Sequence, residues 1–156
     1  MYTYSYNKAR GLLVGLLSGR YNSETDYRRV VYTIGQLIDD ARGRPGGAVC
    51  VLAAEPENPH PNAAWRKRLA ELQERAGSRT QRFLFVLVTE SQIMRGVMTE
   101  IRWLKPPTPP HETVTISTFE EAMRWVEARR GESLFELRGL LLEAARSRSS
   151  ASLGLV

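Results

Sequence analysis

The sequence is poor in the residues that form disulfides, metal sites and acid–base pairs. Its 156 residues include one cysteine, Cys50, and two histidines, His60 and His111. A single cysteine excludes an intrachain disulfide. No apolar run approaches the roughly 18 residues that a membrane helix needs, and the first residues lack the basic and then apolar layout of a signal peptide. These absences predict a cytoplasmic protein without membrane insertion.

Side-chain catalysis needs a nucleophile with a base, or a set of metal ligands, and the sequence shows neither. His60 and His111 fall in proline-rich stretches without a second ligand nearby, so we expect exposed loop histidines. Cys50 lies in an apolar run, where a buried thiol behaves as a small hydrophobe. The glycine-rich segment 43–47 lacks phosphate-loop spacing and precedes a strand. We therefore expect no enzyme activity, no cofactor and no metal.

Positive charge is in excess but scattered. The formal net charge is +5, and arginine carries most of it because the only lysines are Lys8, Lys67 and Lys105. The densest basic patch consists of Arg66, Lys67, Arg68, Arg75, Arg79 and Arg82. Nucleic-acid interfaces usually gather basic residues on one face, whereas here acidic residues are interspersed with the arginines. The patch is interpreted as a solvated helix face, and nucleic acid is not an expected partner.

Apolar runs and period-two alternation predict five strands. The first two, separated by a turn at 7–10, favour an opening β-hairpin. The continuous apolar runs at 48–53 and 83–88 suit parallel strands that are covered on both faces. Strands are predicted over residues 2–6, 12–17, 48–53, 83–88 and 113–116.

Apolar stripes at helical spacing predict a helix after each of the last four strands. Three positions resemble capping boxes, in which a hydroxyl and an acidic side chain satisfy free N–H groups at a helix start. They are Ser23 with Asp26, Thr118 with Glu121, and Ser133 with Glu136. Further helices follow Asn62 and Ser91, and prolines 106–110 form a rigid spacer. The order predicts an α/β fold with a mostly parallel four- to five-stranded sheet, opened by a hairpin and flanked by helices.

This order of elements resembles the STAS fold of sulfate transporters and anti-sigma-factor antagonists. The likeness covers about residues 1–130 and rests on three segments. Residues 12–26 look like the family's second strand and first helix entry, and residues 89–104 look like a segment of uncharacterised bacterial STAS-like proteins. Residues 119–126, with their Glu-Glu-Ala and Trp pattern, resemble the final helix. The resemblance implies a non-catalytic protein-interaction module with a regulatory or scaffolding role.

The sequence departs from the family at the site of regulatory phosphorylation. Antagonists of the family are phosphorylated on a serine or threonine in a turn after the third strand, but residues 55–63 contain no hydroxyl side chain. The resemblance therefore implies a module without the phospho-switch. An alternative is a small-ligand or nucleotide-binding module that uses the crevice at the carboxyl ends of the strands. Its candidate residues are Glu55, Asn58, Glu90 and Ser91.

The chain continues past the expected STAS-like domain of residues 1–131. Residues 132–147 predict an additional amphipathic helix, and the serine-rich residues 148–156 predict a flexible tail. The helix either packs on its own domain or binds a protein partner or a second copy. Candidate partner-binding residues are Leu134, Phe135, Leu137, Leu141 and Leu142, with the apolar end 153–156 as a docking peptide.

Overall fold

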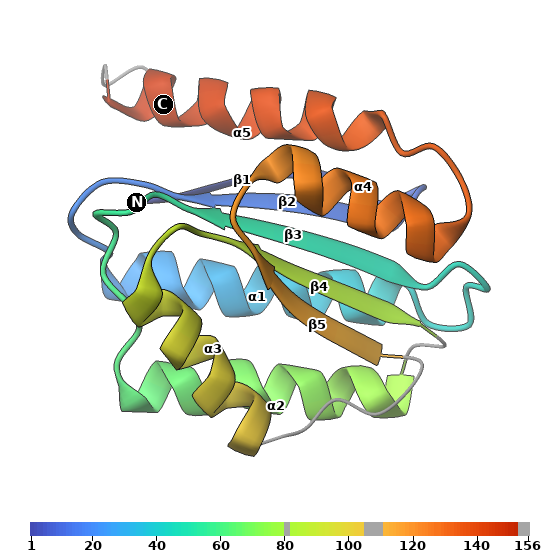
Figure 1. Cartoon of the computed structure of the whole chain (residues 1–156), viewed down its shortest axis with the longest axis horizontal. Coiled ribbons are helices and arrows are strands. Elements are labelled where there is room, and N and C mark those ends of the chain that lie inside the picture. Colours follow the sequence, from blue (N-terminus) through green and yellow to red (C-terminus); the bar gives the residue numbers. More distant parts are fainter. Residues whose placement is uncertain (80–81, 105–110, 153–156) are drawn as a thin grey trace.

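The computed structural model describes residues 1–79, 82–104 and 111–152, and shows one sheet with helices on both faces (Figure 1). The strands are β1 (Tyr2–Asn7), β2 (Leu12–Leu17), β3 (Ala48–Ala54), β4 (Phe83–Val88) and β5 (His111–Ile116). The helices are α1 (Glu24–Asp40), α2 (Ala63–Arg79), α3 (Gln92–Leu104), α4 (Phe119–Arg130) and α5 (Glu136–Ser152). The predicted proline spacer at 106–110 and the apolar end at 153–156 lie outside the described residues.

The five strands lie in the sheet in the order of the chain. β1 pairs with β2 in antiparallel register, from Tyr2 opposite Leu17 to Asn7 opposite Leu12, so the predicted hairpin is confirmed. β2, β3, β4 and β5 each run parallel to their neighbour. The turn between β1 and β2 ends at Gly11, whose positive φ of 66° favours glycine. The predicted α/β fold with a mostly parallel, hairpin-opened sheet is therefore confirmed.

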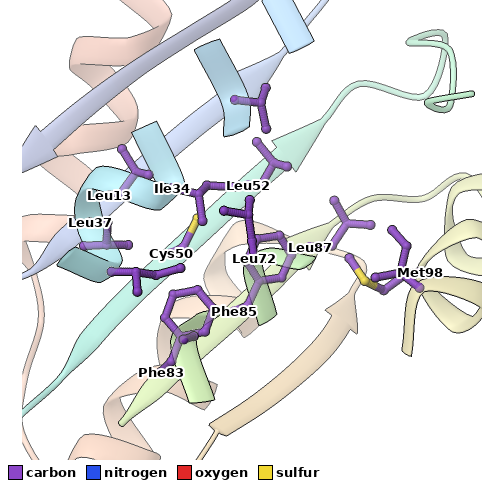
Figure 2. Close-up of a cluster of buried hydrophobic side chains, with 14 of the residues drawn as sticks. Leu13, Ile34, Leu37, Cys50, Leu52, Leu72, Phe83, Phe85, Leu87 and Met98 are labelled. Atoms are coloured by element: carbon purple, nitrogen blue, oxygen red, sulfur yellow. The ribbon is translucent and has the colours of Figure 1, made fainter. Parts of the chain in front are cut away.

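Helices α1, α2 and α3 cover one face of the sheet. Each connects two adjacent parallel strands that follow one another in the same direction, so right-handed crossovers place all three helices on the same side. The core beneath them is drawn in Figure 2. It joins Leu13, Cys50, Leu52, Phe85 and Leu87 of the strands to Ile34 and Leu37 of α1, Leu72 of α2 and Met98 of α3. The predicted burial of Cys50 is confirmed.

Helices α4 and α5 cover the opposite face. The other set of alternating strand residues packs there, including Leu12, Val14, Val49, Val51, Leu84 and Val86. Ala122 and Val126 of α4 join this core, together with Leu134, Leu137 and Leu140 at and before α5. α5 lies over β1 and β2, beside α4 (Figure 1). Of the two alternatives for the C-terminal helix, the structure therefore shows the one in which it packs on its own domain.

The start of β5 differs from the sequence prediction. The strand begins at His111 rather than Thr113, with His111 opposite Phe83 of β4. His111 is consequently buried, and its placement in an exposed loop was wrong. The inward-facing alternation of His111 and Thr113 explains why the strand extends back to the histidine.

Of the three positions predicted to be capping boxes, two lie at the start of a helix. Ser23 and Asp26 form a reciprocal capping box on α1, and the Thr118 hydroxyl accepts a hydrogen bond from the backbone N–H of Glu121 on α4. Ser133 does not start α5, which begins at Glu136. The backbone N–H of Leu134 instead donates to a carboxylate oxygen of Glu127 at 2.7 Å. An acid of the preceding helix thus fixes the turn before α5.

The expected flexible tail is helical as far as Ser152. The hydroxyls of Ser147 and Ser149 donate to the carbonyl oxygens of Glu143 and Ala145, each four residues earlier. Such bonds to the preceding turn let serine take a place in a helix. Arg148 also forms an ion pair with Glu55, which attaches this stretch to the sheet. Within the described ranges, none of the helices is long and apolar enough to cross a membrane.

Candidate interaction site at the carboxyl edge of the sheet

Two loops at the carboxyl edge of the sheet are joined by a pair of asparagines. Asn22 lies before α1 and Asn58 lies between β3 and α2, and both are buried. The amide of Asn22 donates to Asn58 Oδ1 at 2.8 Å, and the amide of Asn58 donates to Asn22 Oδ1 at 3.0 Å. Asn58 Nδ2 also lies 3.2 Å from the Ser18 carbonyl and 3.0 Å from that of Gly19. One side chain of the second loop therefore fixes the backbone of the first.

Glu55, the first residue after β3, connects the same loop to the C-terminal helix. One of its carboxylate oxygens accepts a hydrogen bond from the backbone N–H of Gly19 at 3.2 Å, and the other binds Arg148 of α5. Glu55 and Asn58, both from the loop after β3, therefore bind the backbone of the loop between β2 and α1. Arg148 was predicted to lie in a flexible tail, so the sequence did not identify this contact.

The amino group of Met1 holds the loop from a third direction. It donates to the carbonyl oxygens of Ser18 at 2.7 Å and Tyr21 at 2.8 Å. Asp26 lies nearby and accepts hydrogen bonds from the backbone N–H groups of Ser23 at 2.7 Å and Tyr2 at 3.0 Å. Partial burial opposes ionisation of Asp26, but these hydrogen bonds outweigh it and lower the pKa of the carboxyl group.

Tyr21 projects from this fixed loop into solvent, with 75% of its surface exposed. Beside it lies an open hollow of about 420 Å³, whose lining includes Gly19, Arg20, Tyr21, Glu55 and Arg148. The backbone that carries Tyr21 is held by the hydrogen bonds of Asn58, Glu55 and Met1. We define Arg20, Tyr21 and this hollow as the carboxyl-edge surface. Arg20 and Tyr21 were not among the site residues predicted from the sequence.

The four residues of the predicted ligand crevice make different contacts. Asn58 and Glu55 bind the loop between β2 and α1, as described above. Ser91 immediately precedes α3, and its hydroxyl accepts a hydrogen bond from the backbone N–H of Met94 at 3.2 Å. Glu90 is exposed. Three of the four side chains thus already form hydrogen bonds within the protein. The arrangement therefore favours a role in fixing loops over a role in binding a ligand.

The five apolar residues predicted to bind a partner differ in their exposure to solvent. Leu134 and Leu137 are fully buried against the sheet, and Leu141 is partly buried on the same core, because the helix packs on its own domain. All three side chains therefore belong to the core on this face of the sheet. Phe135 and Leu142 are 75% and 55% exposed. They are the only two of the five that a partner could reach directly.

The residues considered for catalysis lie apart in the fold. Cys50 is buried in the middle of β3, and burial raises the pKa of its thiol. His60 is exposed in the loop before α2, whereas His111 is buried at the start of β5. Among the described residues, no group of three or more His, Cys, Asp or Glu side chains is arranged to hold a metal ion.

Comparison with protein-family models, curated proteins and solved structures gave no match for this chain. The family resemblance therefore rests on the order of elements and on the three sequence segments given above.

Proposed function

We propose that the chain is a non-catalytic protein-interaction module of the STAS type, which binds its partner through the carboxyl-edge surface. The observation that carries the proposal is the exposed ring of Tyr21 on a loop whose backbone is fixed by hydrogen bonds. Tyrosine and arginine dominate the binding energy of protein interfaces, and a rigid loop loses little entropy on binding. Arg20 lies next to Tyr21 and is also exposed.

The arrangement of the sheet supports the family assignment. A hairpin is followed by parallel strands in chain order, with the three crossover helices on one face. This is the order of elements on which the resemblance to the STAS fold depends. The proposed module has a regulatory or scaffolding role. Because the loop after β3 lacks serine and threonine, that role does not include phosphorylation at this loop.

A second candidate function is binding of a small ligand in the hollow beside Tyr21. Its volume of about 420 Å³ falls within the range of ligand pockets, about 300–1,000 Å³. The hollow is open, however, and Glu55 and Arg148 in its lining bind each other. A ligand would have to compete with that ion pair. A protein partner could contact Tyr21 and Arg20 without breaking that ion pair, because both side chains are already exposed.

Affinity capture with matched tyrosine variants tests the proposal. Tyr32 is the control because it is 69% exposed on α1, away from the carboxyl edge. We expect one partner, identified by mass spectrometry and then purified, to bind the wild type and Tyr32→Ala equally and Tyr21→Ala at least tenfold more weakly. Equal binding by all three proteins would contradict the proposal. A copurifying small molecule that only Tyr21→Ala loses would favour the second candidate.

A further inference from the structure

Four arginines from distant parts of the sequence gather at the amino edge of the sheet, opposite the carboxyl-edge surface. Arg10 lies in the turn before β2, Arg44 before β3 and Arg82 before β4, while Arg130 ends α4. Strands β2, β3 and β4 are parallel, so the residues that precede them meet at one edge. We call these four residues the arginine cluster.

Contacts through glycine and glutamate place Arg10, Arg44 and Arg130 together, and Arg82 lies beside Gly47, where an added Cβ would be 2.8 Å from the Cβ of Arg82. The guanidinium of Arg130 lies directly over Gly46, where an added Cβ would be 2.8 Å from Nη2. Arg44 approaches Gly11 in the same way, with Nη1 2.9 Å from a Cβ placed there. Oε1 of Glu132 binds Arg10 Nη2 at 2.9 Å and Arg130 Nη2 at 3.4 Å. Residues more than a hundred positions apart thus share one carboxylate oxygen.

Arg130 is a largely buried member of the cluster. Only 8% of its side chain is exposed, and its buried Nη1 has no hydrogen-bond acceptor among the described residues. Burial lowers the pKa of Arg130; Glu132 opposes this, and Arg10, Arg82 and Arg44 lower the pKa further. A buried guanidinium N–H without an acceptor is costly, and neighbouring positive charges add to that cost.

The protein supplies fewer negative charges here than the cluster requires. Among the residues that the structure describes, the carboxylates bound to the cluster are those of Glu132 and Glu136, and both bind Arg10. The cluster therefore has four guanidinium groups and two bound carboxylates, and in the described part of the chain only Arg10 and Arg130 contact those carboxylates. A phosphate group carries a charge of about −1.5 to −2 at pH 7 and offers several strong acceptor oxygens, so it matches this excess. Guanidinium groups are also the side chains best suited to bidentate phosphate binding.

We propose that the arginine cluster is a binding site for a phosphate group, either free or carried by a small phosphorylated molecule. Arg130 and Arg82 bind the phosphate, and Arg44 and Arg10 close the site from the two adjacent turns. The site is separate from the carboxyl-edge surface and does not depend on the proposed function. Because Arg10 and Arg130 both bind Glu132 between α4 and α5, bound phosphate ties this connection to the sheet.

Isothermal titration and thermal unfolding at constant ionic strength test the site. The probes are sodium phosphate, pyrophosphate and ADP, with sodium chloride as the reference salt. We expect saturable binding that raises the melting temperature, and at least a tenfold weaker affinity in Arg82→Gln and Arg130→Gln. Arg124→Gln is the control, because it removes the same charge from an exposed position of α4. Arg82→Gln keeps the test valid if the Arg130 variant does not fold.

The probes also separate the two sources of phosphate. Binding of inorganic phosphate alone supports a site for the free ion, and tighter binding of pyrophosphate or ADP supports a phosphorylated ligand. No saturable binding of any probe, or equal affinity in Arg82→Gln and wild type, overturns the proposal. Binding of duplex DNA without binding of the three small probes also overturns it, because the contact would then be a diffuse electrostatic one.

Discussion

The side chains of Asn22 and Asn58 bind each other through two amide hydrogen bonds, although 36 positions separate them in the sequence. Both amides are buried, and Asn58 also binds two carbonyl groups of the neighbouring loop. Buried polar groups stabilise a structure only when their hydrogen bonds are satisfied, as they are here. The pair therefore sets the shape of the carboxyl edge and the position of Tyr21.

Replacing Asn58 should destabilise the fold. Asn58→Ala removes the buried partner of Asn22 and takes one donor from each of the Ser18 and Gly19 carbonyl groups, so we expect a loss of about 1–3 kcal/mol in the free energy of unfolding. Urea denaturation measures this loss. His60→Ala, in the same loop but exposed, should change stability by less than about 0.5 kcal/mol. If the two variants were equally stable, Asn58 would not fix the loop.

Two glycine substitutions should have opposite effects. In Gly15→Ala the new methyl group would lie 2.7 Å from Tyr2 Cε1 and 2.9 Å from Leu52 Cδ1. The Tyr2 hydroxyl is bound to Thr33 at 2.8 Å, so its ring has little room to move. We expect a loss of about 1–3 kcal/mol from overpacking.

Gly139→Ala is the matched change, because Gly139 lies within α5 and an added Cβ meets nothing within 4 Å. It should stabilise the protein by about 0.5–1 kcal/mol, since alanine favours the helix. Thermal unfolding of both variants provides the comparison. A neutral Gly15→Ala variant would contradict the packing of Tyr2 over this strand.

The C-terminal helix should behave as part of the core. Leu137→Ala removes a fully buried side chain and should cost about 2–5 kcal/mol, whereas Leu142→Ala should cost less than about 0.5 kcal/mol. For the same reason a protein truncated after residue 131 should lose cooperative unfolding in circular dichroism. A truncated protein that unfolds at the wild-type temperature would show that α5 is dispensable for the fold.

Stability should fall at alkaline pH because burial raises the pKa of Cys50, Tyr2 and Tyr6. The ordinary pKa values are 9.0 for the thiol and 10.0 for the phenol. Above these values the unfolded chain releases protons that the folded protein keeps, so proton release favours unfolding. The stabilising contribution is complete below pH 9 and declines as pH rises, with a limiting slope of about 1.4 kcal/mol per pH unit for each group.

Urea denaturation between pH 7.5 and 10.5 tests this expectation. Cys50→Ala should remove the decline that begins near pH 9. Tyr2→Phe should remove one share of the decline that begins near pH 10, and Tyr6 accounts for another. The native thiol should also resist a disulfide reagent at pH 9, because it is buried. Identical pH profiles for the wild type and Cys50→Ala would show that the buried thiol makes no contribution.

Much of the fold was predictable because burial leaves a local pattern. The run Phe83–Val88 is buried along its whole length between two layers of helices, and such strands are apolar at every position. The Ser23 capping box is equally local, since its two partners are three residues apart. The start of β5 was less predictable, because His111 is a polar residue that occupies an inward position.

The carboxyl edge could not be predicted from the sequence, because its contacts join distant residues. Arg148 lies 93 positions from Glu55 in a serine-rich stretch that is typical of a flexible tail. Asn58 lies among prolines, where no periodicity distinguishes a buried amide from an exposed one. The start of α5 likewise depends on Glu127 of another helix instead of the nearby Ser133. Such contacts follow from the tertiary structure alone.

Site-specific photocrosslinking tests directly whether the partner binds the carboxyl-edge surface, because it records which surface contacts the partner. A benzoylphenylalanine is placed in the full chain at Tyr21, at Tyr32 on α1, or at Phe135 before α5, three exposed aromatic positions. We expect a protein adduct of discrete mass from position 21 and none from positions 32 and 135. An adduct from position 135 or 32, with none from position 21, would contradict this expectation.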